Sequence, residues 1–241
     1  MKKSIATLVI GLAVGLGYIG ASQAEERAWS WSPLGIGIAA PAQLPFMSSD
    51  VYGLRFGGFL GYNADVYGLD AGVAELTTGD FIGLQGSAMS WTDGSVYGIQ
   101  GAFLANVVHE RMIALQVAPV NVVWGDAGGI QVGLVNYDAA FAGLQVGGVI
   151  NWNVSATYGL EIGAVNANQD EFTGCAIGGL VNYSEKFTGF ALAPVNVSYE
   201  MTGYQLGLVN ACDRLHGVQI GLINMITESK LPIMVIANAS F

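Results

Sequence analysis

Residues 203–225, GYQLGLVNACDRLHGVQIGLINM, contain the phrase G-x-Q-[LI]-G-L-[VI]-N twice, opening at Gly203 and again at Gly217. Aligned on its opening position, the phrase recurs every 14–16 residues along the chain. The opening positions are Gly53, Gly68, Gly83, Gly98, Ala114 as a substitute, Gly129, Gly143, Gly159, Gly174, Gly189, Gly203 and Gly217. Twelve units therefore run from about 52 to 229 without a linker. Such regular self-similarity predicts one repeat-built β domain over 25–241, flanked by an N-terminal strand at 33–46 and a C-terminal strand at 231–241.

Each unit alternates between apolar and polar residues. The residue after the opening position is mostly apolar, and the next one, here called the Gln position, is mostly polar. The Gln position holds Arg55, Asp70, Gln85, Gln100, Gln116, Gln131, Gln145, Glu161, Gln205 and Gln219, with Ala176 and Ala191 in the two remaining units. This period of two predicts β-strands with two different faces. A helix would need apolar spacings of three and four, and each interior Gly would cost it roughly 1 kcal/mol.

A second polar residue, at what is here called the Asn position, recurs later in eight of the twelve units. It holds Asn121, Asn136, Asn151, Asn166, Asn182, Asn196, Asn210 and Asn224. Two units insert an extra residue before it, Gly148 and Gly179, and Pro119 and Pro194 fall in the same region of two others. An insertion would reverse the faces of a straight strand, and Pro cannot donate to a ladder, so we predict a bulge or bend there.

The N-terminus indicates export. Lys2 and Lys3 precede an apolar stretch from Ile5 to Ile19 and a small-residue segment ending at Ala24. This order is typical of a secretory signal peptide, which we predict to be residues 1–24. Export makes a disulfide between Cys175 and Cys212 feasible, but the two lie at different places in the repeat, so buried free thiols are expected.

Charge excludes one class of partner. Without Lys2 and Lys3, six of the eight basic residues remain against 18 acidic ones, a formal net charge of −12. No basic surface is available to neutralise phosphates, so nucleic acid is not an expected partner. Charged residues make up only 11% of the chain and the mean hydropathy is +0.49, which is unusual for a soluble domain. After residue 24, Gly and polar residues interrupt every apolar run, so no membrane-spanning helix is expected.

Two architectures satisfy the repeat. The preferred one is an antiparallel meander closed into an outer-membrane β-barrel of about 14 strands. The terminal Phe241 resembles the membrane-assembly signal of bacterial outer-membrane barrels, and aromatic residues at both strand margins would form two interfacial belts. Charged residues facing lipid cost roughly 2–4 kcal/mol, so the Gln position would face the lumen.

The alternative is a β-solenoid with rungs of about 15 residues. In that fold the Gln and Asn positions would stack into side-chain ladders, and Arg55 would lie over Asp70. The turns also fail to alternate between short and long, as they do in outer-membrane barrels. The low charge content favours the barrel, because lipid is the natural neighbour of an apolar exterior.

The chain from Ala42-Gln43-Leu44-Pro45, through the G-[LV]-Q-[IVL]-G-L-[VI]-N units, to Phe241 resembles a family of bacterial surface repeat proteins built on GLQIGLVN. The resemblance covers nearly everything after the signal peptide, although the units of Gly68, Gly83 and Gly98 lack the Asn that completes the phrase. It implies attachment to the bacterial outer membrane or cell surface. The family has no established activity, so no site residue can be transferred from it.

Residues with catalytic potential are few. His109 and His216 lie in predicted turns without convergent partners, and the turn carboxylates would bind calcium only if the turns cluster. No Gly-rich phosphate loop or Ser/His/Asp set is present, so we expect no catalytic, cofactor or metal site and no enzyme activity.

The expected function is a non-enzymatic outer-membrane or surface barrel with a structural or small-pore role. Its partners would be outer-membrane lipid and the barrel-assembly machinery, which would recognise the C-terminal strand. The alternative is a secreted or surface-attached β-solenoid that acts in binding or adhesion and contacts its partner through the ladder face.

Overall fold

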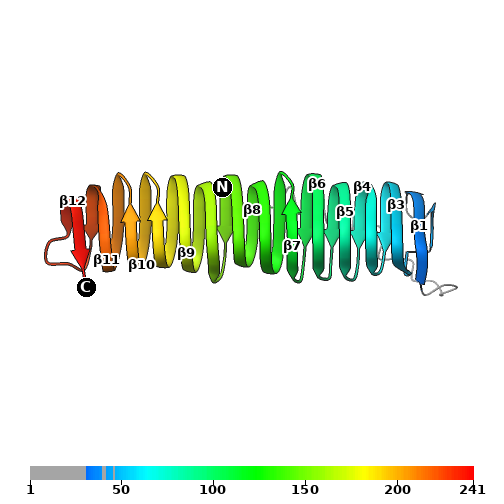
Figure 1. Cartoon of the computed structure of the whole chain (residues 1–241), viewed down its shortest axis with the longest axis horizontal. Coiled ribbons are helices and arrows are strands. Elements are labelled where there is room, and N and C mark those ends of the chain that lie inside the picture. The colour runs from blue at the N-terminus through cyan, green and yellow to red at the C-terminus, as the bar shows by residue number, and fades with distance from the viewer. Residues whose placement is uncertain (1–30, 40–41, 46) are drawn as a thin grey trace, which may run out of the picture.

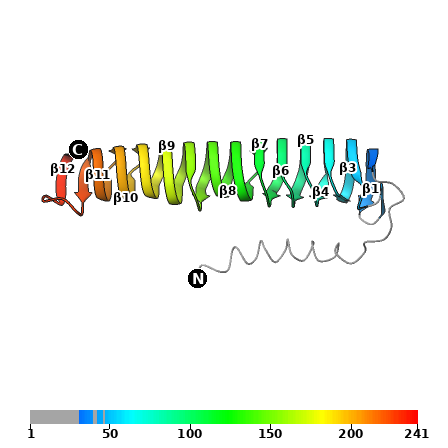
Figure 2. The same cartoon turned by 90° about the horizontal axis from the view of Figure 1, so that it is seen from below.

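The repeat units coil into an elongated β-solenoid in which each unit forms one rung (Figure 1). The computed structural model describes residues 31–39, 42–45 and 47–241; the predicted signal peptide, 1–24, lies outside them. The strands are β1 (Trp31–Ala39), β2 (Ala42–Leu44), β3 (Asp50–Asn63), β4 (Val66–Thr77), β5 (Phe81–Thr92), β6 (Val96–Val108), β7 (Met112–Val117), β8 (Val120–Asn153), β9 (Thr157–Leu192), β10 (Val195–Leu206), β11 (Val209–Ile226) and β12 (Ile233–Ser240). Together they form a 12-stranded sheet. Seen from below, the rungs follow one another along a single straight axis (Figure 2).

The strands of successive units pair parallel and in register. Gly53 pairs with Gly68, and Gly68 with Gly83, so the opening positions lie over one another. The same register places Gly203 beside Gly189 and Gly217 beside Gly203 at the other end. The predicted antiparallel barrel is therefore wrong, and the alternative β-solenoid is correct. The low charge content misled the prediction, because this fold encloses its amide side chains and leaves many apolar ones outside.

Glycine at the opening position has a steric cause. Gly159 has φ of +130°, which L-residues rarely adopt, and a Cβ atom there would lie 2.0 Å from the carbonyl oxygen of Gly143 on the preceding rung. Equivalent close contacts recur from rung to rung along this column. Ala114 is the one non-glycine residue in the column, and it does not have positive φ. The repeat therefore requires glycine wherever the backbone keeps this conformation.

Each rung bends where the sequence predicted a bulge or corner. Pro119 separates β7 from β8, and Pro194 separates β9 from β10. In the unit that carries the inserted Gly148, the register between β8 and β9 shifts between Gly147 and Ile150. These observations confirm the predicted bend. The chain then turns again to enter the next unit, so every rung has two strand arms, one with the Gln position and one with the Asn position.

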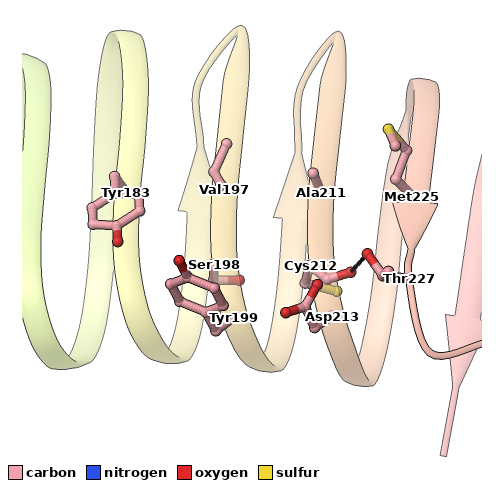
Figure 3. Close-up of a pocket in the computed structure, with 9 residues that line it drawn as sticks. All are labelled: Tyr183, Val197, Ser198, Tyr199, Ala211, Cys212, Asp213, Met225 and Thr227. Carbon is pink, nitrogen blue, oxygen red and sulfur yellow. Dashed lines mark hydrogen bonds between the residues drawn. The ribbon is translucent and has the colours of Figure 1, made fainter.

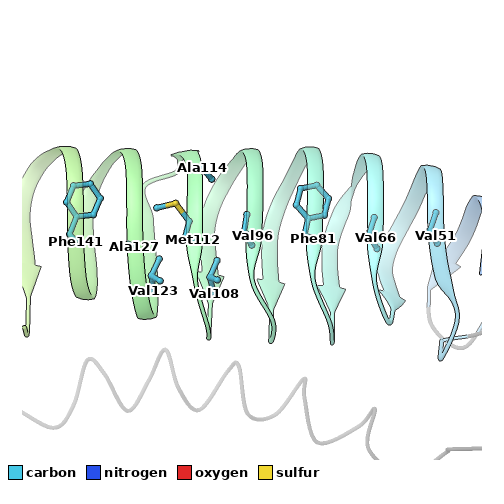
Figure 4. Packing of buried hydrophobic residues seen from close by; sticks show 10 residues of the cluster. All are labelled: Val51, Val66, Phe81, Val96, Val108, Met112, Ala114, Val123, Ala127 and Phe141. Carbon is cyan, nitrogen blue, oxygen red and sulfur yellow. The ribbon is translucent and has the colours of Figure 1, made fainter.

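The core contains apolar and polar columns. Two residues before eleven of the twelve opening positions, an apolar side chain points inward, and these side chains pack along the axis (Figure 4). Thr157 holds this place before Gly159. The N-terminal part of this column includes Val51, Val66, Phe81 and Val96, all 1% exposed or less. The residues at the Gln and Asn positions are also buried. Many Leu, Ile, Val and Phe side chains remain on the outside. Compared with most soluble proteins, more amide side chains are therefore buried and more apolar side chains are exposed.

Both ends of the described solenoid depart from parallel stacking. The predicted strand at 33–46 spans most of β1 and all of β2, which pair with each other antiparallel, while β1 pairs parallel with β3. In the predicted strand at 231–241, β12 runs antiparallel to β11 from Gly217↔Ser240 to Met225↔Ile233. A change of strand direction thus ends the repeat on each side.

Candidate functional site

The residues predicted at the Gln position lie together in one buried row. Each is 5% exposed or less, so they form a packed ladder and do not line a lumen. The amides donate toward the N-terminus: Gln145 to Gln131 at 3.0 Å, and Gln131 to Gln116 at 3.2 Å. The row continues through Gln100 and Gln85 to Asp70, with donor–acceptor distances of 2.5–2.8 Å. Near the C-terminal end, Gln219 donates to Gln205 at 2.9 Å.

A buried ion pair terminates this ladder at its N-terminal end. Arg55 binds Asp70 through two hydrogen bonds, Nε to Oδ1 at 2.7 Å and Nη2 to Oδ2 at 2.6 Å, as expected for the solenoid alternative. Glu75 lies 3.2 Å from the same Nη2 atom. Burial raises the pKa of Glu75 to about 7, although the charge of Arg55 opposes that shift. The Arg55 guanidinium neutralises the carboxylate of Asp70, which accepts the last hydrogen bond of the ladder from Gln85.

The Asn position forms a second ladder with the opposite direction. Each Nδ2 donates to Oδ1 of the next Asn toward the C-terminus, at 2.8–3.1 Å. The participating residues are Asn106, Asn121, Asn136, Asn151, Asn166, Asn182, Asn196, Asn210 and Asn224. Asn106 corrects the prediction that the unit of Gly98 lacks this residue, because the parallel register places it beside Asn121. The second amide hydrogen usually reaches a backbone carbonyl, as from Asn151 to Ile162 at 3.1 Å. Buried amides of this kind stabilise the fold only because both donors and the acceptor have partners.

A buried carboxyl network interrupts the Gln ladder in the middle of the solenoid. Asp138 accepts hydrogen bonds from Gln131 and Gln145. Glu161 accepts from Asn153 at 2.5 Å and from Asn168 at 2.9 Å. Neither acid has a cationic partner among the ion pairs of the described chain.

Both carboxyl groups are held toward the neutral form. Burial raises the pKa of Glu161 to about 7, although hydrogen bonds from Asn168 and Asn153 oppose the shift. Burial also raises the pKa of Asp138 well above its ordinary value, and the nearby Glu161 charge adds to the increase. Sequence reasoning placed Glu161 in the Gln position but missed Asp138, Asn153 and Asn168. Their inward direction follows from their place two residues after the Asn position.

The two alanines of the Gln position belong to a buried apolar cluster with aromatic side chains. Ala176 and Ala191 are each 1% exposed, and Phe172 and Phe187 pack beside them with ring centroids 4.8 Å apart. Apolar packing thus replaces amide hydrogen bonds for two rungs. The exchange shows that the interior tolerates either filling, provided that the volume is occupied.

The outer surface has two contrasting edges. The turn edge consists of the turns that join one unit to the next. Apart from the five buried charges already described (Arg55, Asp70, Glu75, Asp138 and Glu161), every charged residue of the described chain lies there. The acidic members are Asp50, Asp65, Asp80, Asp93, Glu110, Asp126, Asp170, Glu171, Glu185, Glu200, Asp213 and Glu228, and the basic ones are Arg111, Lys186, Arg214 and Lys230. Successive turns are linked by contacts such as Arg111–Asp126 at 3.6 Å.

The opposite, corner edge comprises the residues between the Gln and Asn positions, where each rung bends. It carries no charged residue in any of the twelve units. Its exposed apolar side chains are Phe56, Phe59, Val73, Phe103, Leu104, Val117, Val132, Leu134, Val149, Ile162, Leu180, Leu192, Leu208, Ile220, Leu222 and Ile223. Phe103 is 79% exposed and Phe59 is 71% exposed, so these are not partly covered core residues. The solenoid is amphipathic along its whole repeat region.

No catalytic arrangement accompanies these ladders in the described residues. Nδ1 of His109 lies 3.4 Å from Asp93 on the surface, and His216 contacts the ring of Phe241. The acids Asp138 and Glu161 are enclosed, which leaves them no access to a substrate. Within 31–39, 42–45 and 47–241, no three His, Cys, Asp or Glu side chains gather to hold a metal ion. The same part of the chain contains no helix with the length and hydropathy to cross a membrane.

One surface depression lies near the turn edge on the Asn-position arms. Its lining includes Tyr183, Tyr199, Ala211, Asp213 and Met225 (Figure 3). Its volume is about 180 Å³, whereas ligand pockets usually enclose about 300–1,000 Å³. Thr227 hydrogen-bonds to the carbonyl of Cys212 beside it and is already paired. The depression lacks the convergent polar groups of a small-molecule site.

The two cysteines are free. Cys212 is buried, as predicted, whereas Cys175 is only half-buried, so the prediction of two buried free thiols holds for one of them. Burial raises the pKa of the Cys212 thiol to about 12, so it remains protonated and unreactive.

The described residues therefore present an enclosed hydrogen-bonded interior and an amphipathic exterior. Comparison of the chain with protein-family models, with curated proteins and with solved structures found no match.

Proposed function

We propose that the protein is an exported, non-enzymatic β-solenoid attached to the bacterial cell surface, where it acts as a rigid binding scaffold. The order of residues in the N-terminal 24 positions supports export. The parallel stacking of the units supports a rigid rod, because each rung is hydrogen-bonded to its neighbours through the backbone and through side-chain ladders.

The observation that carries this proposal is the separation of the corner edge from the turn edge. Parallel register repeats each outward side chain on every rung, at the strand spacing of about 4.8 Å. A single apolar position in the repeat thus becomes a line of apolar side chains along the rod. Such a surface is suited to an extended partner, since soluble monomers rarely leave contiguous apolar surface beyond a few hundred Å² uncovered.

Binding must use this exterior. The sequence alternative placed binding on the ladder face, but Gln131, Gln145 and Asn151 are fully enclosed. A small-pore role depended on an open interior, and the same burial removes it. The assembly role of Phe241 depended on a barrel and has no support once the strands pair parallel.

Surface attachment can be tested by labelling intact cells. Asp93 lies on the turn edge and is half-exposed, so Asp93→Cys in a Cys175→Ser background supplies a reactive outward thiol. The native Cys212 is buried and serves as an internal control that reacts only after unfolding. In a Gram-negative host that expresses the full chain, a membrane-impermeant maleimide should label the introduced thiol on intact cells. Labelling that requires cell lysis would refute the surface location.

A further inference from the structure

We propose that the corner edge binds the interfacial region of a lipid bilayer, with the rod axis parallel to the membrane plane and the turn edge directed toward water. The inference rests on the proposed function, and it specifies the partner that the scaffold binds. Three independent features of the exterior lead to it.

The first feature is the absence of charge at the corner edge. In all twelve units the residues between the Gln and Asn positions are apolar or small, with Ser87 as the one hydroxyl. Phe103, Leu134 and Leu180 are 79%, 55% and 58% exposed, so their side chains can leave water without any rearrangement of the rung. Interfacial proteins insert such an apolar face about 5–10 Å into the boundary between headgroups and acyl chains.

The second feature is the position of the exposed aromatic residues. Tyr52 and Tyr158 precede the opening Gly on the Gln-position arms, and both are about half-exposed. Trp124 and Tyr199 lie on the Asn-position arms, again close to the turns. On both arms the aromatic rings therefore stand between the apolar corner edge and the charged turn edge. Trp and Tyr prefer this level of a bilayer, because one part of the ring is apolar and the other can reach water.

The aromatic residues lie differently in the solenoid than in the predicted barrel. The two predicted belts would mark opposite membrane surfaces in a meander. In the solenoid, Phe141, Phe172 and Phe187 before the opening Gly are buried in the core. The bend of each rung brings the two arms together, so the exposed aromatic residues of both predicted belts flank the same apolar edge. They indicate one membrane surface and a rod that lies in it.

The third feature is shape. The corner edge is the outside of a bend, so it is convex in cross-section. Two convex edges from two copies of the chain would bury little area against each other, whereas lipid chains can conform to a ridge. The same edge is hollowed near its C-terminal end by an apolar groove of about 420 Å³, lined by Leu206, Leu208, Ile220 and Ile236. A groove without polar side chains fits a section of an acyl chain.

Charge predicts how the binding should respond to lipid composition. The turn edge is strongly acidic, so it would be repelled by anionic headgroups and cannot draw the protein to the membrane. The driving force is burial of apolar surface, which salt does not screen. Binding should therefore occur on zwitterionic vesicles and should be nearly independent of ionic strength.

The test measures cosedimentation of the full chain with sucrose-loaded phosphatidylcholine vesicles. The test variant carries Phe103→Glu, Leu134→Glu and Leu180→Glu on the corner edge. The matched control carries Ser155→Glu, Gln169→Glu and Thr188→Glu, three exposed positions at or beside the turn edge, so it has the same added charge. We expect the wild type and the control to bind alike, and the corner variant to bind at least about tenfold more weakly. Circular dichroism of all three proteins verifies that the strands are retained.

Several results would overturn the inference. Equal binding by the corner variant and the wild type would show that the corner edge is not the contact. A wild type that ignores vesicles but sediments as a dimer, with the dimer lost in the corner variant, would assign the edge to a second copy of the chain. If the Asp93→Cys variant is labelled on intact cells while vesicles are not bound, only the lipid inference fails. If labelling also requires lysis, the proposed function fails with it.

Discussion

Nδ2 of Asn136 donates a hydrogen bond to Oδ1 of Asn151 on the next rung, over a distance of 2.8 Å. In the same rungs, Gln145 donates to Gln131 in the reverse direction along the axis. The two amide ladders therefore run antiparallel to each other inside a parallel-stacked fold. Their side-chain dipoles oppose, so the rungs that carry both ladders gain hydrogen bonds without accumulating a large dipole along the rod.

Replacing Asn151 with Leu should destabilise the solenoid strongly. The change removes the acceptor for Asn136 and the donor for Asn166, so two buried amide groups lose a partner. At about 1–3 kcal/mol for each unpaired group, we expect the free energy of unfolding to fall by about 2–6 kcal/mol. Urea unfolding followed by circular dichroism measures the loss.

The exposed Gln169 provides the control for this substitution. Gln169→Leu makes a comparable exchange of amide for hydrocarbon on the surface and should change stability by less than about 0.5 kcal/mol. If the two leucine variants unfold at the same urea concentration, the Asn ladder does not stabilise the fold.

The strands, the corner and the stacking of Arg55 over Asp70 could be predicted from the repeat. Period-two alternation defines the strands, and an inserted Gly148 in one unit can only be absorbed at a bulge. The choice between barrel and solenoid could not be made from the same pattern, because both folds place the Gln position on one face. The low charge content then favoured the barrel, which is the wrong fold. That inference holds only if an apolar exterior lies against lipid on all sides.

The interior network was predictable only in part. The Gln and Asn positions were visible because the same residue type recurs, whereas Asp138 and Asn153 belong to a column whose residue types vary from unit to unit. Their role emerges only when the register brings them beside Glu161 and Gln145. The aromatic margins were predicted only in part: Tyr52 and Tyr158 are exposed, whereas Phe141, Phe172 and Phe187 before the opening Gly are buried in the core. The fold also decides whether the exposed rings lie on opposite surfaces or flank one edge.

Gly159→Ala should be among the most damaging small substitutions. The added Cβ would lie 2.0 Å from the carbonyl oxygen of Gly143, and alanine also resists the φ of +130°. Strain of this kind costs about 1–3 kcal/mol before the steric contact is counted, so we expect a loss of at least about 3 kcal/mol. Thermal or urea unfolding provides the measurement.

Ala114 supplies the matched control in the same column. It lacks positive φ, so Ala114→Gly relieves no strain and removes one buried methyl group. The loss should be about 1 kcal/mol. Equal effects at Gly159 and Ala114 would contradict the steric explanation of the repeated glycine.

Arg55→Met should lower the free energy of unfolding, because it leaves two buried acids at the N-terminal end without a cation. The variant leaves Asp70 and Glu75 enclosed without their cation. Breaking a buried ion pair from one side typically costs about 3–5 kcal/mol. Adding Asp70→Asn and Glu75→Gln to the same chain removes the orphaned charges and should recover most of that stability. A triple variant that is no more stable than Arg55→Met would show that Arg55 acts through packing alone.

The enclosed acids make stability depend on pH. The folded pKa of Glu161 is raised from 4.5 to about 7, and burial raises the pKa of Asp138 as well. The folded state therefore binds more protons than the unfolded state over this range, so the free energy of unfolding falls as pH rises from about 4.5 to about 7. The stabilisation is fully present below the unfolded pKa and is lost by the time pH exceeds the folded pKa. A shift of this size corresponds to about 3 kcal/mol for Glu161.

Glu161→Gln separates this effect from general acid sensitivity. The groups around Glu161 are Asn153, Asn168, Gln145 and Asp138, and none of them carries a positive charge. The amide cannot ionise, so the variant should lose about 3 kcal/mol less than the wild type between about pH 5 and about pH 8. It also removes the nearby negative charge that raises the pKa of Asp138, which flattens the profile further. Wild-type and variant curves that run parallel across this range would contradict the raised pKa of Glu161, and with it the effect of its enclosure between Asn153 and Asn168.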